Sequence, residues 1–511
     1  MLILIGASLL VLFATWVFYV ELMDPLRKYP GPWLARYTSI WRLFHSITTM
    51  KELPMIGLHE KYGSVVRLGP SCLSFDDPQA RRDIYGSNTF AKSEFYPTAA
   101  AVLKGKPTPS LFSSTDATWH DDLKRKFKRH YSLSSVASFE SALDERISKL
   151  ISRIAEVQQQ ERYLDLSAWM ELLTYDVIAV LTFGEHKRLL ENGADVDSVM
   201  SDAGFYHTYN QIVGQMPLLH NLILKNPILS WLERTGYVTK AANPLAQFAA
   251  KQIRSRAQQR EQDEKICMLD VFLREQDARK LDASEKVKIH DGEIQGMLLG
   301  NMLAGSVTTS ISLSTALFEI MKHPDVYRKL RQEVDDTFEQ ITCTEKHGEG
   351  QKTVIPLAKA LEMEYLSACI LEGQRLHPPV RFSPERVTPS TGATIAGEAI
   401  PGGTIVSTSP WLLQRHPAVF GNNAQSFVPE RWLHEQSSKG MRANMMTFGP
   451  DKYRCIGEDI SRLEIVKVLP TLLYHYDLEL VDPAQKPEIT WGNTVSVKGI
   501  NVRFMPRTGR Q

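Results

Sequence analysis

The sequence of 511 residues has no excess of charge of either sign and very little cysteine. Its 59 lysines and arginines nearly cancel its 58 aspartates and glutamates, which argues against binding of nucleic acid through overall charge. The cysteines are odd in number and form no Cys-x-x-Cys pair, so we expect no disulfide framework, no structural zinc site and a reducing compartment. The five are Cys72, Cys267, Cys343, Cys369 and Cys455.

Charged residues are also absent from Leu2 to Val20. These residues would form about 28 Å of helix, close to the thickness of a bilayer core. A cleaved signal peptide is the alternative, but no basic region precedes the segment and no small-x-small cleavage site follows it. Basic residues occur only after it, beginning at Arg27, which predicts that the bulk of the protein faces the cytosol. We therefore expect a transmembrane anchor over residues 1–22, a proline-rich hinge over 23–35 and one large domain over 36–511.

Strand patterns are few and short, whereas helical periodicity dominates the rest of the chain. Residues 64–68 and 72–75 predict two strands around the turn at 69–71, and residues 399–407 have the alternation of a hairpin. The sequence thus predicts a mainly α fold with small β-sheets.

A basic segment runs from Trp119 to Arg129, after Ser114, Thr115 and Asp116, any of which could cap a helix. Such a charge run is usually a solvated helix face. The alternative is that one or two of its cations turn inward to neutralise a buried dianionic cofactor, with the Trp119 indole N–H assisting. The apolar segment 216–224 is similarly open, between plain core and a loop on a membrane surface beside the anchor.

Proline is missing from Asp291 to Lys322, which predicts about 48 Å of uninterrupted helix. Within it, residues 304–309 place small side chains beside two threonines. Glycine costs about 1 kcal/mol relative to alanine inside a helix, so Gly305 needs a reason. Close helix packing is one, and a groove for dioxygen or a substrate, with a threonine hydroxyl that holds a water, is the other.

Glu372 and Arg375 share one helix face at i and i+3, and the helix should end at His377-Pro378. An isolated pair of this kind is usually a surface ion pair of little energetic value. A second arginine, Arg431, follows within the Pro-Glu-Arg-Trp sequence about fifty residues later. Together the three would form a buried network, which suggests an organising role.

One cysteine, Cys455, lies in a loop rich in turn formers, Phe448 to Gly457, directly before a helical segment. Most cysteines in a chain with so few are small buried side chains. A thiolate at this position can instead be an axial ligand of haem iron.

Taken together, these features resemble the cytochrome P450 superfamily in order and spacing over the whole chain. Residues 28–33 and 62–86 look like fungal microsomal members of the pisatin demethylase and secondary-metabolite type. The resemblance implies the P450 fold, with haem b between the long central helix and the cysteine loop, preceded by one transmembrane helix.

The resemblance also implies residue roles. Cys455 would be the proximal thiolate, Thr308 would support proton delivery, and Glu372, Arg375 and Arg431 would form a structural triad. Other residues would surround the cofactor and the substrate: Trp119, Lys124 or Arg125, Arg386, Arg454 and Phe448 near the haem, and Leu303, Ala304, Val307 and Val380 to Ser383, with Phe382, on the substrate side.

The chain departs from the family pattern at three places. Asp451 and Tyr453 stand where glycine and a propionate-binding arginine are usual, so that charge must come from Arg454, Arg386 or the Trp119 helix. Val307 replaces the acid before the distal threonine, which leaves proton delivery to Thr308 and water or to the substrate. The usual Trp-x-x-x-Arg pattern ends at Leu123 instead of arginine.

The implied activity is a monooxygenase that uses O2 and electrons from an NADPH-cytochrome P450 reductase, with cytochrome b5 as a second donor, to oxidise a lipophilic small molecule in secondary metabolism. The implied location is the endoplasmic reticulum membrane, single-pass, with the catalytic domain in the cytosol. Two alternatives stay open: desaturation, rearrangement or oxidative coupling without net oxygen insertion, and a haem-binding protein without turnover.

Overall fold

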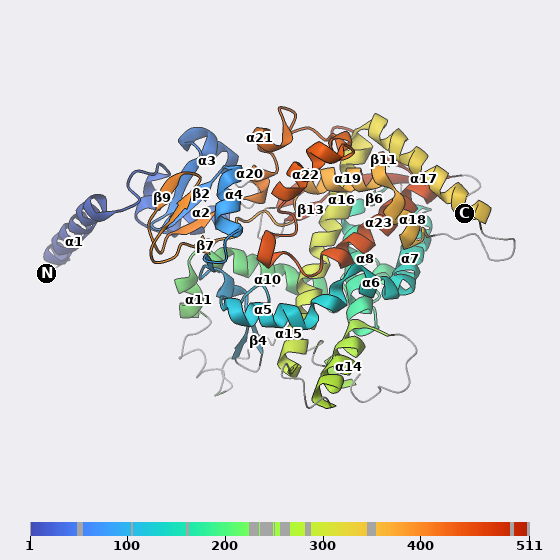
Figure 1. Ribbon diagram of the computed structural model, residues 1–511, viewed down its shortest axis with the longest axis horizontal. Coiled ribbons are helices and arrows are strands. Elements are labelled where there is room, and N and C mark those ends of the chain that lie inside the picture. Colours follow the sequence, from blue (N-terminus) through green and yellow to red (C-terminus); the bar gives the residue numbers. More distant parts are fainter. Residues whose placement is uncertain are drawn as a thin grey trace.

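The computed structural model describes residues 2–48, 55–103, 106–159, 163–223, 235, 249, 251–255, 266–281, 288–344, 354–490 and 495–507. They form a mainly helical body with small β-sheets, which confirms the expected mainly α fold (Figure 1). The α-helices are α1 (Leu2–Met23), α2 (Ile40–Thr48), α3 (Met55–Tyr62), α4 (Pro78–Tyr85), α5 (Ala117–Phe127), α6 (Leu133–Val136), α7 (Glu140–Gln158), α8 (Leu166–Phe183), α9 (Leu189–Asn192), α10 (Val199–Gly214), α11 (Pro217–Ile223), α14 (Met268–Leu281), α15 (Asp291–Gly305), α16 (Val307–Lys322), α17 (Pro324–Thr344), α18 (Leu357–Glu362), α19 (Glu364–Leu376), α20 (Pro410–Leu413), α21 (Pro417–Phe420), α22 (Glu435–Asn444) and α23 (Glu458–His475).

The strands are β1 (Val65–Gly69), β2 (Cys72–Phe75), β3 (Ala91–Lys92), β4 (Ala101–Leu103), β5 (Lys106–Thr108), β6 (Leu164–Asp165), β7 (Arg386–Val387), β8 (Ala393–Ile395), β9 (Glu398–Ile400), β10 (Ile405–Ser407), β11 (Tyr476–Leu480), β12 (Glu488–Thr490), β13 (Ser496–Lys498) and β14 (Asn501–Pro506). The largest sheet has the order β1-β2-β10-β7-β3. The hairpin predicted at 64–75 is confirmed, because β1 and β2 pair antiparallel.

The hairpin predicted at 399–407 is wrong. β9 pairs with β8, whereas β10 pairs with β7 and, in parallel, with β2. The true β8–β9 turn contains Ala396 (φ 49°) and Gly397 (φ 82°), the two positive φ angles that a type I′ hairpin turn requires. The alternation at 399–407 therefore reports two strands in different sheets.

The central helix expected at 291–322 is interrupted at Ser306, between α15 and α16. Ser306 Oγ donates to Met302 O (3.3 Å) and Thr308 Oγ1 donates to Ala304 O (2.7 Å). Hydroxyls that bond to the carbonyl four residues earlier compete with the helix ladder and bend it. The Thr308 hydroxyl, which was expected to hold a water, thus bonds to the backbone beside the break.

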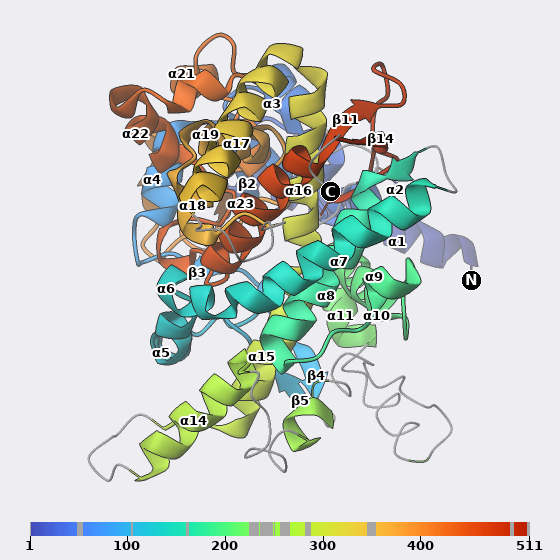
Figure 2. The ribbon, with the colours of Figure 1, turned by 90° about the vertical axis from the view of Figure 1, so that its right-hand side faces the viewer.

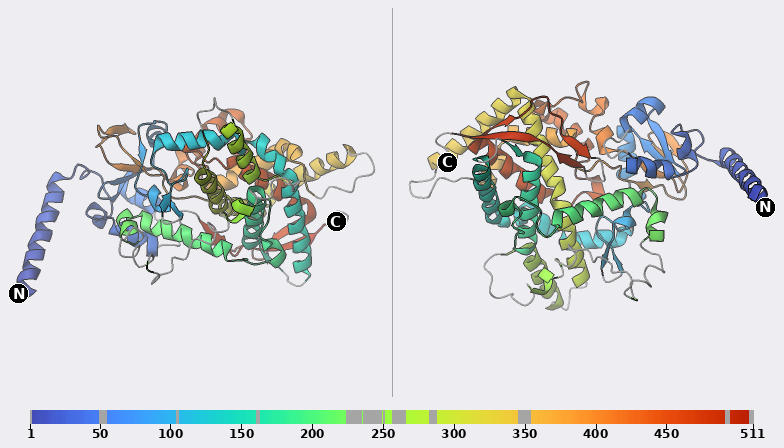
Figure 3. Two further views of the ribbon diagram at one scale, coloured as in Figure 1. Left: turned by 90° about the horizontal axis from the view of Figure 1, so that it is seen from below. Right: turned by 180° about the vertical axis from the view of Figure 1, so that it is seen from behind.

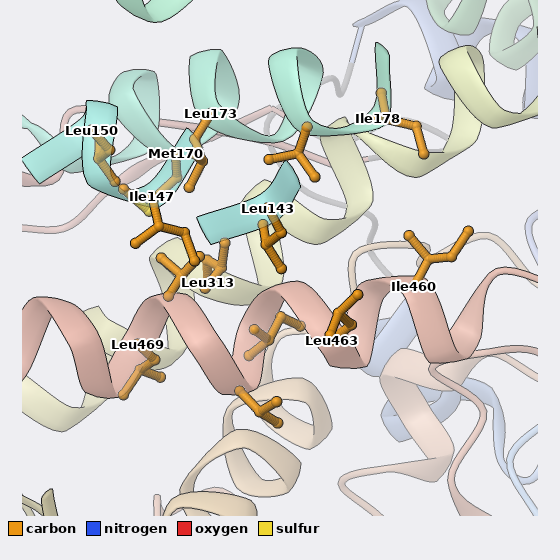
Figure 4. Close-up of a cluster of buried hydrophobic side chains, with 14 of the residues drawn as sticks. Leu143, Ile147, Leu150, Met170, Leu173, Ile178, Leu313, Ile460, Leu463 and Leu469 are labelled. Carbon is orange, nitrogen blue, oxygen red and sulfur yellow. The ribbon is translucent and has the colours of Figure 1, made fainter. Parts of the chain in front are cut away.

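The core lies where α7, α8, α16 and α23 meet (Figure 2). Figure 4 shows Leu143 and Ile147 of α7, Leu173 of α8, Leu313 of α16 and Leu463 of α23 in one apolar cluster, and each is at most 1% exposed. Truncation of such a leucine to alanine typically costs about 2–5 kcal/mol. The helices that bear Thr308 and follow Cys455 are therefore fixed to each other by the core.

Two helical stretches are long and apolar enough to cross a membrane in the described part of the chain: α8 and the combined span of α15 and α16. They are core helices, because 83% and 72% of their apolar windows are buried inside the protein. The N-terminal helix α1 projects away from the body and ends in a shorter apolar stretch, Ala14–Met23 (Figure 3).

The Pro-Gly-Pro segment after α1 packs against the first strand of the large sheet. Pro30 O accepts a hydrogen bond from Arg67 N (2.8 Å). A Cβ at Gly31 would lie 2.2 Å from Arg67 O, so only glycine fits there. The segment expected as a hinge is thus joined to β1 by backbone contacts.

Candidate active site

Cys455 lies in a tight loop directly before α23. The loop is closed by hydrogen bonds from Cys455 N to Phe448 O (2.7 Å) and from Tyr453 N to Pro450 O (3.1 Å). The thiol is surrounded by protein, and this burial raises the pKa of Cys455, although the Gly457 N–H acts in the opposite direction. The residue is nevertheless exposed to solvent. A thiol that is deep and still accessible is suited to binding a ligand, unlike Cys72 and Cys369, which are buried.

The backbone conformation of this loop explains why the family pattern has glycine at the position of Asp451. Asp451 has φ 40°, in the left-handed region, and Gly449 has φ 78°. Aspartate is one of the few other residues that tolerate this region. Its carboxylate lies 3.6 Å from a guanidinium nitrogen of Arg81 on α4. Asp451 therefore keeps the backbone shape of the loop and adds an ion pair.

At the end of α15, Ala304 is exposed although Leu303 and Met302 beside it are buried. Thr308 shares this helix face, and its hydroxyl donates to Ala304 O. Gly305 faces the other way, where a Cβ would lie 2.9 Å from Ile178 of α8. Close helix packing thus accounts for the glycine, while Ala304 and Thr308 form the accessible surface.

Hydrogen bonds join this helix to α23, which follows the cysteine loop, and to the 3-10 helix Lys128–Tyr131. Thr309 Oγ1 donates to Ser461 Oγ of α23 (3.1 Å). The Tyr131 hydroxyl donates to Asn301 Oδ1 of α15 (2.7 Å), and the electrostatic influence of Cys455 contributes to the raised pKa of Tyr131, after burial. The helix that bears Thr308 is therefore joined to the helix that directly follows Cys455.

Glu372, Arg375 and Arg431 meet in a buried network. Glu372 and Arg375 of α19 are 0% exposed and form two hydrogen bonds of 2.8 Å. Arg431 Nε donates to Glu372 Oε1 (2.9 Å), from the 3-10 helix η5 (Pro429–Trp432). The Trp432 indole N–H donates to the other carboxylate oxygen (2.9 Å). Arg375 also donates to the Gln414 carbonyl (2.8 Å), so the network ties α19 to the chain that leads to the cysteine loop.

The cations of the basic segment 119–129 lie partly on a solvated helix face and partly turned inward. Asp116 caps α5, and the Arg125 side chain is 71% exposed and paired with Asp122, as on a solvated face. Lys124 instead turns inward and donates to the carbonyls of Lys452 and Arg454 (2.8 Å each). Trp119 is half-buried on the same helix.

Two of the arginines expected near the cofactor differ sharply in position. Arg454 is exposed and forms an ion pair with Glu458, 2.6 Å between Nη2 and Oε1. Arg386, on β7, is buried, and its guanidinium lies 4.5 Å from the centre of the Tyr453 ring. Lys92 on β3 lies beside it, 4.8 Å from the same ring. Lys92 was not expected at the site, because no motif surrounds it in the sequence.

The residues expected on the substrate side occupy two regions. Phe382 joins an aromatic cluster, with ring centroids 5.3 Å from Phe95, 6.4 Å from Tyr96 and 6.0 Å from Phe112. Leu303 O accepts a hydrogen bond from His207 Nε2 of α10 (3.0 Å) when that nitrogen is protonated. Val380, two residues before Phe382 in sequence, is half-buried.

Val307 lies on another face of the central helix. It lines a small pocket with Glu171 and Ser167 of α8 and with Ser310 and Ser314 of α16. Burial raises the pKa of Glu171. An apolar side chain thus lines this pocket at the position where the family pattern has an acid.

Comparisons with known proteins identify the fold family. A family model described as Cytochrome P450 matches residues 30–502. Similar curated proteins include a cytochrome P450 monooxygenase of Aspergillus terreus, 33% identical over 464 residues, which are 89% of this chain and 90% of the relative. Cytochrome P450 monooxygenase cicH of Emericella nidulans is 32% identical over 502 residues (98% and 97%), and pisatin demethylase of Fusarium vanettenii is 29% identical over 481 residues (94% and 88%). The family model matches nearly the whole chain, and the exposed Cys455 lies within the matched residues; the chain therefore belongs to the cytochrome P450 family of haem-dependent monooxygenases.

Proposed function

We propose that the protein is a membrane-anchored haem-thiolate monooxygenase that oxidises a lipophilic small molecule in fungal secondary metabolism, with Cys455 as the axial ligand of the iron. The observation that carries this proposal is the accessible Cys455 thiol between a closed turn and the start of α23. The relatives named as fungal cytochrome P450 monooxygenases and as pisatin demethylase support oxidation of a small molecule in a fungus.

The residues fit haem b on both sides. Cys455 offers a thiolate, Ala304 leaves a small accessible surface on the distal helix, and buried cations lie beside the loop at Arg386 and Lys92. When bound, thiolate-ligated haem supplies the activation of dioxygen. The protein supplies the ligand, the apolar surroundings and a hydroxyl at Thr308 that can hold a water and pass a proton.

The Glu372 network acts at a distance from the reacting atoms in this proposal. It fixes the segment between Gln414 and Trp432, which precedes the cysteine loop. Glu372, Arg375 and Arg431 are therefore positioning residues.

Substitution of the ligand tests the proposal directly. Cys455→Ala should abolish the strongly red-shifted Soret band of the reduced carbon monoxide complex, and Cys369→Ala, at a buried cysteine of α19, should retain it. Survival of the band in Cys455→Ala would show that another residue binds the iron.

Thr308→Ala tests the distal role. If the Thr308 hydroxyl delivers protons, the variant should divert reducing equivalents to peroxide. Thr315→Ala is a matched control, because its hydroxyl makes the same type of bond to Ile311 O, 2.7 Å, but is buried in the core. Unchanged coupling of NADPH use to product in Thr308→Ala would remove the residue from the mechanism.

Membrane attachment is supported by apolar surface near the N-terminus. Ile40 and Phe44 of α2 and Leu218 and Leu222 of α11 are exposed. Helices α2 and α11 flank α10, to which Ser46 is joined by a hydrogen bond to Gln211 O (3.2 Å). Leu224, the end of the apolar segment, lies outside the described residues.

We infer an anchor over 1–22, a hinge over 23–35 and a haem-binding catalytic domain over 36–511 on the cytosolic side of the endoplasmic reticulum. Deletion of residues 2–22 should weaken flotation with microsomes, and full retention in the soluble fraction before deletion would contradict it.

The electron donors in this proposal are NADPH-cytochrome P450 reductase and cytochrome b5. Arg454 and Lys452 lie on the cysteine-loop surface and can meet acidic partner residues, although each already has an acidic neighbour. Reconstitution with the reductase and a lipophilic metabolite pool, followed by mass spectrometry, tests this assignment.

The second candidate function is favoured by Val307. An apolar residue in place of the acid weakens proton delivery and suits desaturation, rearrangement or oxidative coupling. A product heavier by one oxygen supports oxygen insertion, and an unchanged or hydrogen-depleted mass supports the alternative. Absence of substrate-dependent NADPH consumption with reductase present would instead indicate a haem protein without turnover.

A further inference from the structure

Two buried cations face each other across adjacent strands beside the cysteine loop. Lys92 of β3 and Arg386 of β7 are directly opposite partners in the antiparallel register. Lys92 is 6% exposed and Arg386 is 2% exposed. Like charges directly opposite in a sheet repel, and burial increases the repulsion because water no longer screens it. The arrangement is unfavourable unless an anion completes it.

No carboxylate in the described part of the chain forms an ion pair with either cation. Lys92 Nζ donates to the carbonyls of Leu111 and Phe112 (2.8 Å each), which leaves one of its three protons. Among the described residues, Arg386 donates hydrogen bonds through Nη1 only, to the Tyr96 hydroxyl (2.8 Å) and the Glu385 carbonyl (2.8 Å).

The nearest acid in sequence is already engaged. The Glu385 carboxylate pairs with Arg42 and accepts from Ser93 Oγ (2.6 Å). Lys92 Nζ and the remaining N–H groups of Arg386 can therefore still donate hydrogen bonds to an anion.

The third member of this group is Tyr453, two residues before Cys455. Its ring lies 4.8 Å from Lys92 Nζ and 4.5 Å from the Arg386 guanidinium. An aromatic face attracts cations but cannot neutralise two of them. Tyr453 therefore holds the cations at the loop without supplying the missing negative charge.

We propose that Lys92 and Arg386 bind the propionate carboxylates of haem in this protein, and that Lys92, held over Tyr453, supplies the charge that an arginine at position 453 would otherwise provide. This inference rests on the proposed haem site. It assigns a role to a residue that lies more than three hundred positions from the cysteine loop in sequence and reaches it only through the β3–β7 pairing.

The protonation of Lys92 agrees with such a role. Burial, together with the charges of Arg386 and Lys124, lowers the pKa of Lys92 to about 7. A bound carboxylate would favour the ammonium form and raise this pKa again. His120 packs against Tyr453, with ring centroids 4.7 Å apart, and burial lowers its pKa to about 4, so it is neutral at pH 7.

The test measures haem release from the ferric full-length protein to excess apomyoglobin, without substrate. Lys92→Met keeps most of the side-chain volume and removes the charge, and should release haem about tenfold faster. Lys92→Arg should stay within about twofold of the wild type, because it keeps the charge. Arg125→Met is the matched control on a nearby exposed cation, and should leave the rate unchanged.

The apoprotein separates ligand binding from a structural role. If Lys92 serves the propionates, Lys92→Met should leave the thermal midpoint of the apoprotein unchanged or raise it, because a repulsive buried charge is lost. A fall in the apoprotein midpoint with an unchanged haem release rate would mean that the lysine only holds the Leu111 and Phe112 carbonyls, and would overturn the proposal.

A carboxylate of the substrate could bind Lys92 and Arg386 in the same way as a haem propionate. Dodecanoate binding to haem-loaded Lys92→Met, followed by the shift of the Soret band, should match the wild type. Loss of dodecanoate binding with normal haem release would assign the pair to the substrate and overturn the haem assignment. The red-shifted carbon monoxide band should persist in Lys92→Met, and its persistence distinguishes failure of this inference from failure of the Cys455 assignment.

Discussion

Substitution of Glu372 by glutamine should strongly destabilise the protein. The Glu372 carboxylate is fully buried and accepts five hydrogen bonds, from Arg375 Nε and Nη2, Arg431 Nε, Trp432 Nε1 and Val428 N, all between 2.8 and 2.9 Å. Glutamine keeps the shape but removes the charge, and it turns an amide donor toward donors that need an acceptor.

The magnitude follows from the two arginines that stay behind. Loss of one partner from a buried ion pair typically costs about 3–5 kcal/mol, because an uncompensated charge is left in the interior. Here one carboxylate serves both Arg375, at 0% exposure, and Arg431, so we expect the upper part of that range. A typical protein is stable by about 5–15 kcal/mol in total, and the loss is therefore a large share of it.

Urea unfolding of the haem-loaded protein, followed by tryptophan fluorescence and Soret absorbance, measures the effect. Glu435→Gln on the exposed start of α22 is the control and should change the free energy of unfolding by less than about 0.5 kcal/mol. If Glu372→Gln lost less than about 1 kcal/mol, the buried network would be energetically no different from a surface ion pair, and the reasoning would be wrong.

Three further predictions concern single positions. Gly305→Ala should lower the thermal midpoint despite its better helix propensity, because its Cβ would meet Ile178 at 2.9 Å, and Ile178→Val should restore part of the loss. Asp451→Gly should stay within about 0.5 kcal/mol of the wild type in urea unfolding, whereas Asp451→Val should cost about 1–2 kcal/mol at φ 40°; equal losses in the two would refute the backbone argument. Glu464 is fully buried without a hydrogen-bond partner among the described residues, and burial raises its pKa. The wild type should therefore lose stability as the pH rises above the pKa of this carboxyl in the unfolded chain. The free energy of unfolding of Glu464→Gln should increase relative to the wild type by up to about 1.4 kcal/mol per pH unit from pH 5 upward, and parallel curves of stability against pH would contradict this.

Local features of the fold could be predicted from the sequence because nearby residues determine them. Helix α19 ends at Leu376, before the His377-Pro378 sequence, and α5 begins after Asp116, whose carboxylate accepts from Thr118 N and Trp119 N. The strand at 405–407 was misassigned because its partners are distant: β10 pairs with β2, more than three hundred residues earlier. Alternation shows that a segment is extended but not which strand it joins.

In the candidate site, too, contacts between residues close in sequence could be predicted, whereas most contacts between distant segments could not. The geometry of Glu372 and Arg375 follows from their helical spacing, and Arg431 of the Pro-Glu-Arg-Trp sequence lies beside Glu372. The cations could not be sorted in this way. Arg125 and Arg454 look as suitable in sequence as Arg386, but they pair with acids three and four residues away at the surface.

The departures of the cysteine loop are consistent with a redistribution of roles. Asp451 takes the left-handed backbone position that favours glycine, and Tyr453 presents a ring where a cation was expected. A tyrosine there would weaken an anion site if it acted alone. Because its ring lies against Lys92 and Arg386, the positive charge comes from the sheet, and the loop supplies the surface that positions it. The pairing of β3 with β7 is thus as much a part of the cofactor site as the cysteine loop, and a change that shifts this register should alter haem affinity without touching Cys455.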